Sequence, residues 1–329
     1  MTAGAGRTVL VTGAGGFVGS AIVRRLVLAD ARFGDGARVA HVAALLRPGG
    51  SEERLQELPR DGSWSIVHAD TSDPAALRAA VEKLRPQAVI HAALDPAVYV
   101  DDDPRLVRGP LESLLQGLCA TTGGRFLHVG SAWVLASGDL LAESAPLAPL
   151  THYARNKARE DHLLPEIAGA VGVPWINLRL FNLFGRYEKP TRLLPTLVSR
   201  LARRETVELT HGDQVRDFSD VDVAASAFLH ALAAPDSACG FLYHVGSGRG
   251  TTVRALAQSV AEIVGHGDLI RFGVSGAEDE DLAYLVADPS RAMTVLGWRP
   301  DPDLEGRVRD AVEWWLARLP SGAAREVTA

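Results

Sequence analysis

The sequence has little cysteine, no long apolar run and no excess of positive charge. Its 329 residues include only two cysteines, Cys119 and Cys239, too few for a disulfide framework or a cysteine metal cluster, so we expect a reducing cytoplasm and no metal site. No apolar run approaches the roughly 20 residues of a membrane span. A net charge of -6 argues against nucleic acid or an anionic membrane as the main partner. The opening MTAGAGRTVLVTG leads into a strand pattern without the features of a signal peptide.

Short apolar strand patterns alternate with helical patterns through the first half of the chain. The predicted strands are residues 8–13, 37–46, 65–70, 88–94, 125–131 and 173–181, and the predicted helices are residues 18–29, 73–84, 110–122 and a segment around Tyr153. Repeated strand–helix units of this kind specify a parallel sheet with helices on both faces. We therefore predict an α/β fold with a doubly wound parallel sheet.

The first predicted strand runs directly into the glycine-rich turn TGAGGFVG. Glycines allow a tight turn and a close approach of the backbone to a pyrophosphate, whose negative charge is favoured by the amides at the start of the following helix. Because the turn joins a clear strand to a clear helix at the start of an α/β domain, it predicts a dinucleotide site. The residues assigned to it are Gly13, Gly15, Gly16, Phe17, Val18 and Gly19.

The end of the second strand indicates which dinucleotide is bound. An acidic side chain there favours NAD, whereas an arginine accommodates the 2′-phosphate of NADP. The segment VAHVAALLRPGG has no acid at this point and continues into Arg47. We therefore expect NADP(H) to be preferred with Arg47 as the phosphate partner, and NAD(H) stays possible because Arg47 could be a solvated loop residue.

Tyr153 and Lys157 are spaced as neighbours on one helical face within HYARNKARED. In an arbitrary sequence this pair is usually a surface coincidence. Here Ser131 ends a strand at the same sheet edge as the glycine turn, so the three side chains can converge on a nicotinamide. The lysine ammonium would favour proton transfer by the phenol, and Ser131 would hold the reacting oxygen. We predict that Ser131, Tyr153 and Lys157 are catalytic.

These residues resemble the short-chain dehydrogenase/reductase superfamily, specifically its extended branch of nucleotide-sugar epimerases, ketoreductases and dehydratases. The resemblance runs from Val9 to about Trp315. It is carried by the ordered set TGAGGFVG, HAD (68–70), IHAAL (90–94), VGSAWV (129–134), YARNK (153–157), RLFNLFG (179–185), LLP (193–195), QVRDFSDVDVA (214–224) and DPSRAMTVLGWRP (288–300).

The resemblance implies roles for further residues. Asp70 and Thr71 would lie beside the adenine, and Ala92 and Ala93 would line the cofactor; Asp70 could instead cap the helix that follows it. Ser131 and Trp133 would face the sugar, with Asn182 and Arg216 on the diphosphate of a nucleotide-sugar, since a guanidinium binds phosphate oxygens in pairs. Arg216 could instead pair with Asp217 or Asp220.

The resemblance also implies an interleaved layout on a Rossmann-type sheet. Residues 1–181 and 217–249 would form the dinucleotide-binding domain, and residues 182–216 and 250–329 a smaller mixed α/β substrate lobe. The helices that contain PLESLLQGL and Tyr153 often form a dimer interface in this family, so we expect a homodimer.

Departures from the family pattern indicate the reaction. Sugar 4,6-dehydratases follow their catalytic hydroxyl with an acid pair, and this chain has Ala132 and Trp133 there, which argues against dehydration. With Arg47, the pattern favours NADPH-dependent reduction of the keto group at carbon 4 of a nucleotide-activated deoxysugar. A 4-epimerase with tightly bound NAD is the alternative, and a non-catalytic dinucleotide-binding protein is a third reading.

Overall fold

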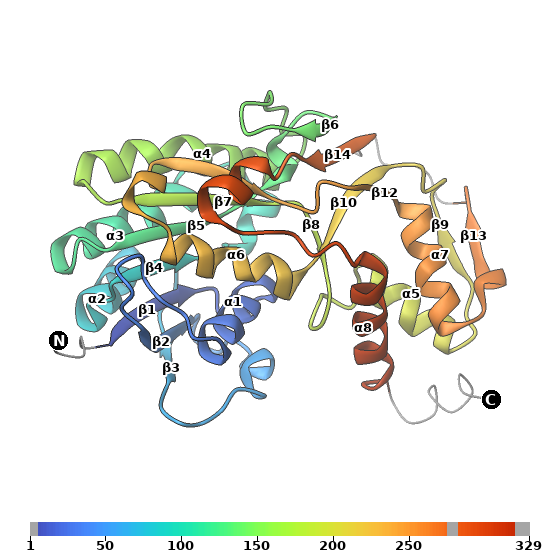
Figure 1. The fold of residues 1–329 in the computed structure, drawn as a ribbon, viewed down its shortest axis with the longest axis horizontal. Coiled ribbons are helices and arrows are strands. Elements are labelled where there is room, and N and C mark those ends of the chain that lie inside the picture. Colours follow the sequence, from blue (N-terminus) through green and yellow to red (C-terminus); the bar gives the residue numbers. More distant parts are fainter. Residues whose placement is uncertain (1–5, 275–281, 320–329) are drawn as a thin grey trace.

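The computed structural model describes residues 6–274 and 282–319, so the parts of the predicted lobes at residues 1–5, 275–281 and 320–329 lie outside the described residues. A seven-stranded parallel sheet forms the larger part of the molecule, in the order β3-β2-β1-β4-β5-β7-β11 (Figure 1). Its strands are β1 (Arg7–Thr12), β2 (Val39–Leu46), β3 (Trp64–His68), β4 (Ala88–His91), β5 (Arg125–Ser131), β7 (Trp175–Leu180) and β11 (Phe241–Val245). The predicted doubly wound sheet is confirmed. Strand order reverses between β1 and β4, where such sheets bind ligands at their carboxyl ends.

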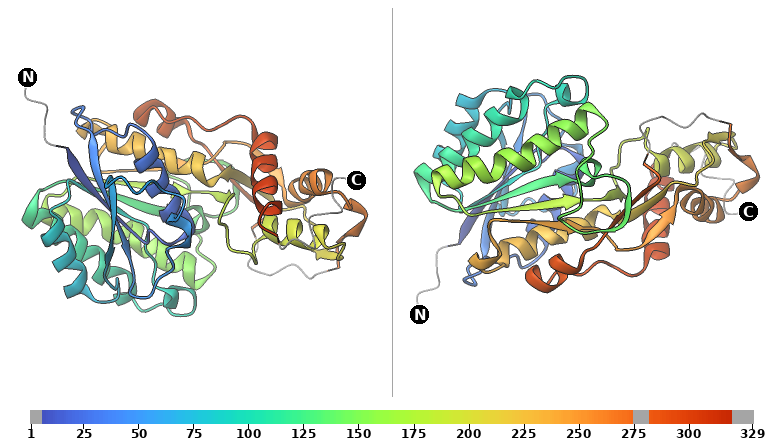
Figure 2. Two further views of the ribbon diagram at one scale, coloured as in Figure 1. Left: turned by 90° about the horizontal axis from the view of Figure 1, so that it is seen from below. Right: turned by 90° about the horizontal axis from the view of Figure 1, so that it is seen from above.

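Helices cover both faces of this sheet (Figure 2). One face carries α1 (Phe17–Leu28) and α6 (Val221–Ala233), and the other carries α2 (Pro74–Leu84), α3 (Arg105–Thr121) and α4 (His152–Val171). Local sequence sets several of the ends. Asp73 accepts from two amides at the start of α2, Thr151 caps α4, and α4 stops at Gly172 in a left-handed conformation.

The structure corrects the predicted start of α3. The sequence placed Pro110 at the first helical position, where its missing amide costs nothing, but the helix begins at Arg105 and contains Pro110 in its interior. The Asp103 carboxylate accepts from the amide of Arg105 and supports the earlier start. The ring of Pro110 is buried in the packed face of the helix.

A five-stranded sheet connects the larger unit to the smaller one. Its order is β12-β10-β14-β6, with β8 paired to β10, and its strands are β6 (Gly138–Leu141), β8 (Asn182–Phe184), β10 (Val215–Asp220), β12 (Gly250–Thr252) and β14 (Tyr284–Ala287). The smaller lobe contains α5 (Leu193–Ala202), α7 (Val253–Val264), α8 (Leu304–Leu316), β9 (Val207–Leu209) and β13 (Ile270–Phe272), packed around a core of their own (Figure 1).

Part of the segment assigned to the smaller lobe packs on the larger core. Ala292, Leu296 and Trp298, all within residues 250–329, are buried against helix α6 and its neighbours. The Trp298 indole donates to Ser226 Oγ at 3.0 Å. Burying the large apolar ring of Trp298 against α6 is more favourable than leaving it exposed in a connecting loop. The chain therefore returns to the larger unit after β14.

Candidate active site

The glycine turn between β1 and α1 leaves no room for side chains. Gly13 has φ +67°, and a Cβ there would lie 2.6 Å from the backbone of Ala92 and Ala93. A Cβ on Gly19 would lie 2.1 Å from the carbonyl oxygen of Gly13. Helix α1 begins at Phe17 without a side-chain cap, so its first amides are free to bind an anion. The turn and the helix start fit a dinucleotide pyrophosphate.

The predicted cofactor residues after β4 lie against this turn. The amide of Ala92 donates to the Thr12 carbonyl oxygen, and the amide of Ala93 donates to Thr12 Oγ1, both at 3.3 Å. Thr12 Oγ1 also lies 2.7 Å from Nδ1 of His91, the last residue of β4. Strands β1 and β4 are therefore joined by hydrogen bonds at their carboxyl ends, where the cofactor would bind.

Arg47 and Asp70 end neighbouring strands at the same edge. Arg47 is exposed just after β2, while Asp70 accepts from the amide and hydroxyl of Ser72, which lowers the pKa of Asp70, with a smaller contribution from Arg47. The alternative that Asp70 caps α2 is wrong, because Asp73 is the cap. Asp70 and Thr71 are thus left at the sheet edge, where the adenine was predicted.

Arg54 is a residue that the sequence reasoning missed. It donates from Nη1 to the carbonyl oxygen of Gly15 and from Nε to the carbonyl oxygen of Tyr187, both at 3.0 Å. It therefore ties the glycine turn to the loop that follows β8. Nothing in the local segment PGGSEERLQEL distinguishes Arg54 from a solvated arginine, so no sequence signal could have found it.

Helix α4 places the predicted catalytic pair along the carboxyl end of β5. Lys157 is buried and donates from Nζ to the Val129 carbonyl oxygen at 3.0 Å. Ser131, the last residue of β5, is also buried, and its Oγ accepts from the amide of Trp133 at 3.3 Å. The ring of Tyr153 stacks on Tyr99, with ring centroids 5.3 Å apart. Lys157 and Ser131 thus lie at the carboxyl end of β5, and Tyr153 lies one turn before Lys157 on the same helix.

Residues predicted to bind the substrate come together from distant parts of the chain. The guanidinium of Arg216 on β10 lies over the Trp133 ring, 5.6 Å from its centroid, and Arg216 is buried. Asp217 accepts hydrogen bonds from Ser247, Gly248 and Ala287, and Asp220 caps α6. Neither carboxylate forms the ion pair with Arg216 that the sequence analysis gave as an alternative.

Asn182 begins β8 and pairs in register with Phe218 of β10. Its side-chain Oδ1 is buried without a hydrogen-bond partner among the described residues. A buried polar atom of this kind is costly unless a ligand or water meets it. This fits the predicted contact between Asn182 and a polar substrate.

Glu188, in the loop after β8, was also missed. It is 5% exposed, and its Oε2 has no hydrogen-bond partner among the described residues. Burial raises the pKa of Glu188 to about 8, which the Arg192 charge offsets only in part. At neutral pH the group therefore holds a proton inside the folded protein.

Replacing Glu188 with glutamine should increase stability more at higher pH. The unfolded carboxyl ionises near its ordinary value of 4.5, whereas the folded one keeps its proton to about pH 8. Folding thus takes up a proton in this window, and wild-type stability falls as pH rises through it. We expect the gain from Glu188→Gln to be about 2 kcal/mol larger at pH 7.5 than at pH 5.5. Urea unfolding at both pH values tests this, with exposed Glu82→Gln as the control; an equal gain at both would contradict it.

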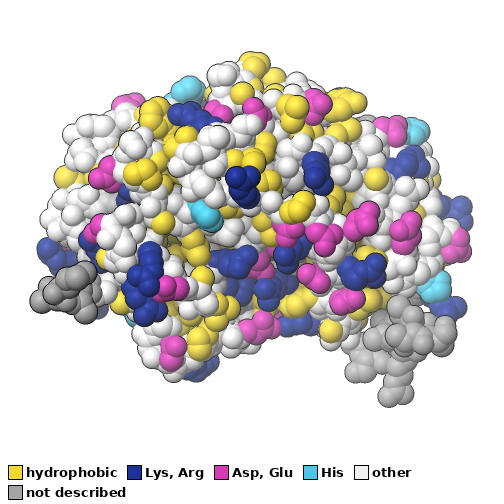
Figure 3. Space-filling view, in the orientation of Figure 1, with side chains coloured by type: hydrophobic (Ala, Val, Ile, Leu, Met, Phe, Trp, Pro, Cys, Tyr) yellow, Lys and Arg dark blue, Asp and Glu magenta, His cyan; other side chains and the backbone are white. Residues whose placement is uncertain are grey.

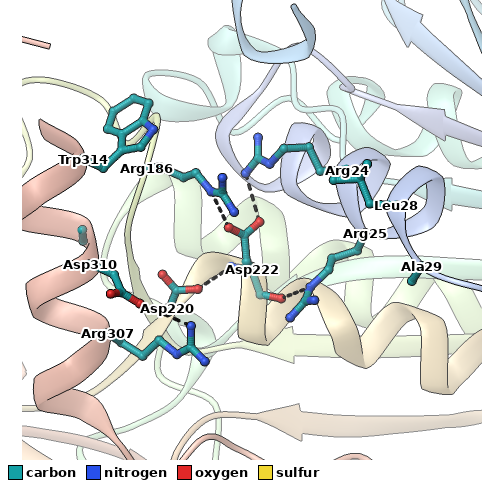
Figure 4. Close-up of a pocket in the computed structure, with 11 residues that line it drawn as sticks. Arg24, Arg25, Leu28, Ala29, Arg186, Asp220, Asp222, Arg307, Asp310 and Trp314 are labelled. Atoms are coloured by element: carbon teal, nitrogen blue, oxygen red, sulfur yellow. Dashed lines mark hydrogen bonds and ion pairs between the residues drawn. The ribbon is translucent and has the colours of Figure 1, made fainter. Parts of the chain in front are cut away.

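A cavity of about 400 Å³ lies between α1, α6 and α8, and none of the predicted catalytic residues lines it (Figure 4). At its centre the Asp222 carboxylate accepts from Arg24 at 3.1 Å and from Arg186 at 2.6 Å, and its backbone oxygen accepts from Arg25 at 2.9 Å. On the face seen in Figure 3, basic and acidic side chains are interspersed. The cluster joins the loop after β8 to the larger unit.

Within residues 6–274 and 282–319, no group of three or more His, Cys, Asp or Glu side chains is placed to hold a metal ion. In the same residues, none of the helices has the length and apolar character needed to cross a bilayer.

Comparison with known proteins identifies the family. The model described as "NAD dependent epimerase/dehydratase family" matches residues 9–246, so the chain belongs to that family. It is 30% identical over 322 residues to a dTDP-glucose 4,6-dehydratase of Actinoplanes sp., covering 94% of this chain and 98% of the relative. It is 26% identical to the dTDP-L-rhamnose 4-epimerase of Burkholderia thailandensis, covering 95% and 96%.

A solved structure agrees with this assignment. A dTDP-glucose 4,6-dehydratase from Streptomyces venezuelae, crystallised with NAD bound, has a TM-score of 0.83 and 25% identity, covering 94% of this chain and 97% of that chain. The predicted resemblance to the extended, nucleotide-sugar branch is confirmed.

Proposed function

We propose that this chain binds a nicotinamide dinucleotide and transfers hydride to or from a nucleotide-activated sugar. The observation that carries the proposal is the position of α4, which holds the Lys157 ammonium on the Val129 carbonyl oxygen, near the end of β5 at Ser131, with Tyr153 one turn earlier on the same helix. This end lies on the same sheet edge as the glycine turn. The names of the relatives, which refer to dTDP-sugars, support the substrate class. The NAD in the similar structure supports the cofactor class.

The residues of the chain then divide the chemistry between them. The bound nicotinamide supplies the hydride. The Ser131 hydroxyl holds the ketone oxygen in line, and the Tyr153 hydroxyl donates the proton that this oxygen needs. The Lys157 ammonium stabilises the charge that develops on the phenol. Trp133, Arg216 and Asn182 bind the nucleotide-sugar at the junction of the two lobes.

We further propose that the reaction is NADPH-dependent reduction of a keto group at carbon 4 of a deoxysugar. Arg47 stands exposed at the end of β2, where a 2′-phosphate would lie. The residues after Ser131 argue against dehydration: Ala132 is fully buried and Trp133 lies under Arg216. Neither side chain carries a carboxyl group that could remove water.

Epimerisation at carbon 4 is the second candidate. The same three catalytic residues serve both reactions, and a 4-epimerase is among the relatives. An epimerase would keep NAD bound and return the hydride to the same sugar, whereas a reductase would take NADPH from solution. Cofactor content therefore separates the two.

The test is oxidation of NADPH and NADH by the purified protein against a panel of nucleotide-linked 4-keto-6-deoxysugars. The cofactor that copurifies is measured after denaturation of the same preparation. Turnover with NADPH supports the reductase. Absence of turnover with NAD already bound would reject it and favour the epimerase.

Arg47→Ala tests the proposed selectivity. Loss of a charge-assisted contact to the 2′-phosphate should weaken NADPH binding about tenfold and leave NADH binding unchanged. Titration of the nicotinamide fluorescence measures both affinities. Arg60→Ala, which removes another exposed arginine after the same strand, should change neither. Equal affinity of the wild type for both cofactors would reject the preference for NADP.

The homodimer stays a prediction. Helices α3 and α4 lie side by side on one face of the sheet (Figure 2), and the ion pair between Arg108 of α3 and Glu166 of α4 joins them. Their outer surface is the one that the resemblance assigns to the interface.

A further inference from the structure

The Lys157 ammonium has a carboxylate partner inside the protein. Its Nζ lies 2.7 Å from Oε2 of Glu160, one turn further along α4, and the two side chains are 7% and 2% exposed. Glu160 is the one carboxylate within ion-pair distance of Lys157 among the described residues. A buried ammonium is costly unless it is paired and hydrogen-bonded, so Glu160 and the Val129 carbonyl oxygen together hold the charge in place.

Asp161, the next residue on α4, has a different role. Its carboxylate lies 2.6 Å from Arg179 on β7 and also accepts from Asn177 at 2.6 Å. Its carboxylate is thus occupied by β7, the strand next to β5 in the sheet. Glu160, and not Asp161, faces the catalytic lysine.

Other titratable groups surround the Glu160–Lys157 pair on every side. From β5, His128 Nε2 lies 3.2 Å from the same Glu160 oxygen, and from β4 the ring of His91 lies 5.7 Å from that of His128. Burial, helped by His128, lowers the pKa of His91 to about 3, so His91 is neutral. On the outer side, Tyr153 stacks on Tyr99, with the charge of Arg192 further away.

The charges of the pair support each other. Burial by itself lowers the pKa of Lys157, but Glu160, with Tyr153 and Asp161, more than offsets it and the pKa lies above its ordinary value. Burial by itself raises the pKa of Glu160, but Lys157 and His128 bring it to about 2. Both groups therefore stay ionised across the physiological pH range.

We propose that Glu160 is a positioning residue that holds the Lys157 ammonium against β5 and keeps the Tyr153–Lys157 pair fully protonated. This is the state that gives a proton to a ketone. Removing a negative charge from beside two protonated groups lowers the pH at which the pair releases its first proton, whichever member releases it. The link to ketone reduction rests on the proposed function, but the protonation of the pair does not require a substrate.

The test is a pH titration by NMR of protein carrying ¹³C at the lysine ε-carbon and the tyrosine ζ-carbon. The chain has three lysines, Lys83, Lys157 and Lys189, and five tyrosines, so the signals are few. In Glu160→Gln the first proton lost by the pair should come off about one pH unit lower than in the wild type. Glu166→Gln, which removes an exposed carboxylate from the same helix, should leave the titration unchanged. A shift of Glu160→Gln no larger than that of this control would overturn the proposal.

Glu160→Asp keeps the charge but withdraws it from Lys157. Its titration should move in the same direction by less, whereas a purely structural role would make it resemble Glu160→Gln. If Glu160→Gln does not fold, the comparison of Glu160→Asp with the wild type decides alone. The proposal is then overturned if the titration of Glu160→Asp does not move to lower pH.

Kinetics separate this proposal from the proposed function. The alkaline limb of the pH profile of kcat should move down by the same amount as the NMR midpoint. An NMR shift without turnover of any panel sugar would support the role of Glu160 and count against the reductase. Turnover of a panel sugar without a shift in the NMR titration would support the reductase and count against the role of Glu160.

Discussion

Replacing Tyr153 with phenylalanine should lower turnover of the keto-sugar by about 10²–10⁴-fold. The variant keeps the ring that stacks on Tyr99 and loses the hydroxyl that would donate the proton. Ser131 and Lys157 would still bind the ketone and the cofactor, so the loss should fall on kcat. Steady-state kinetics with NADPH, together with cofactor affinity from nicotinamide fluorescence, measure the two effects separately.

Tyr99→Phe is the matched control, because it removes a hydroxyl from the neighbouring ring of the same stack. We expect its turnover to stay close to that of the wild type. If Tyr153→Phe kept full activity, general acid catalysis by Tyr153 would be rejected. If neither the wild type nor the variant turned over any sugar while both bound the cofactor, the third reading, a dinucleotide-binding protein without catalysis, would gain support.

Asp222→Ala should destabilise the fold by about 3–5 kcal/mol. Asp222 accepts from Arg24 and Arg186 through its carboxylate (Figure 4), and the Arg24 side chain is only 4% exposed. Without Asp222 a buried guanidinium loses its charge partner, and the cost of burying a charge is no longer offset. Arg186 also loses its ion-pair partner, so one of the contacts between the loop after β8 and α6 is lost. Urea unfolding followed by circular dichroism measures the change.

Two variants sharpen this test. Asp310 lines the same cavity, but its side chain is 69% exposed and lies 3.6 Å from Arg307, a long distance for an ion pair. Asp310→Ala should therefore change the free energy of unfolding by less than about 0.5 kcal/mol. Arg24→Leu in the Asp222→Ala background removes the stranded charge and should restore part of the stability. Equal effects of Asp222→Ala and Asp310→Ala would show that the buried pair contributes nothing special.

Much of the site could be predicted because its signals are local. A strand followed by TGAGGFVG places glycines where a Cβ would collide with the backbone, as it does at Gly13 and Gly19. The spacing of Tyr153 and Lys157 needs only a helix to put them on one face. The strand pattern before Ser131 placed that residue at the edge where the glycine turn also lies. Each inference used fewer than about a dozen consecutive residues and the general rules for parallel sheets.

The helix start that was wrongly predicted and the alternative that was rejected both involve competition between neighbours. The alternative role of Asp70 as the cap of α2 is excluded because the folded geometry selected Asp73. Pro110 satisfied the rule for a helix start, but the helix begins earlier because the Asp103 carboxylate accepts a hydrogen bond from the amide of Arg105. Local rules rank such positions without deciding between them, because the stabilising free energies of competing helix starts differ by only about 1 kcal/mol.

The sequence by itself determined the parallel sheet, the glycine-rich turn between β1 and α1 and the choice of catalytic candidates, because periodicity and turn chemistry act over short distances. Only the tertiary structure decided which distant groups face one another. It set Arg216 over Trp133, joined Arg54 to both Gly15 and Tyr187, and buried Glu160 against Lys157. The contacts of Arg216 and Arg54 cross long stretches of chain. The Glu160–Lys157 pair is close in sequence, but its strength comes from the burial that β5 and α4 create together, since a charge pair gains its influence only where water is excluded.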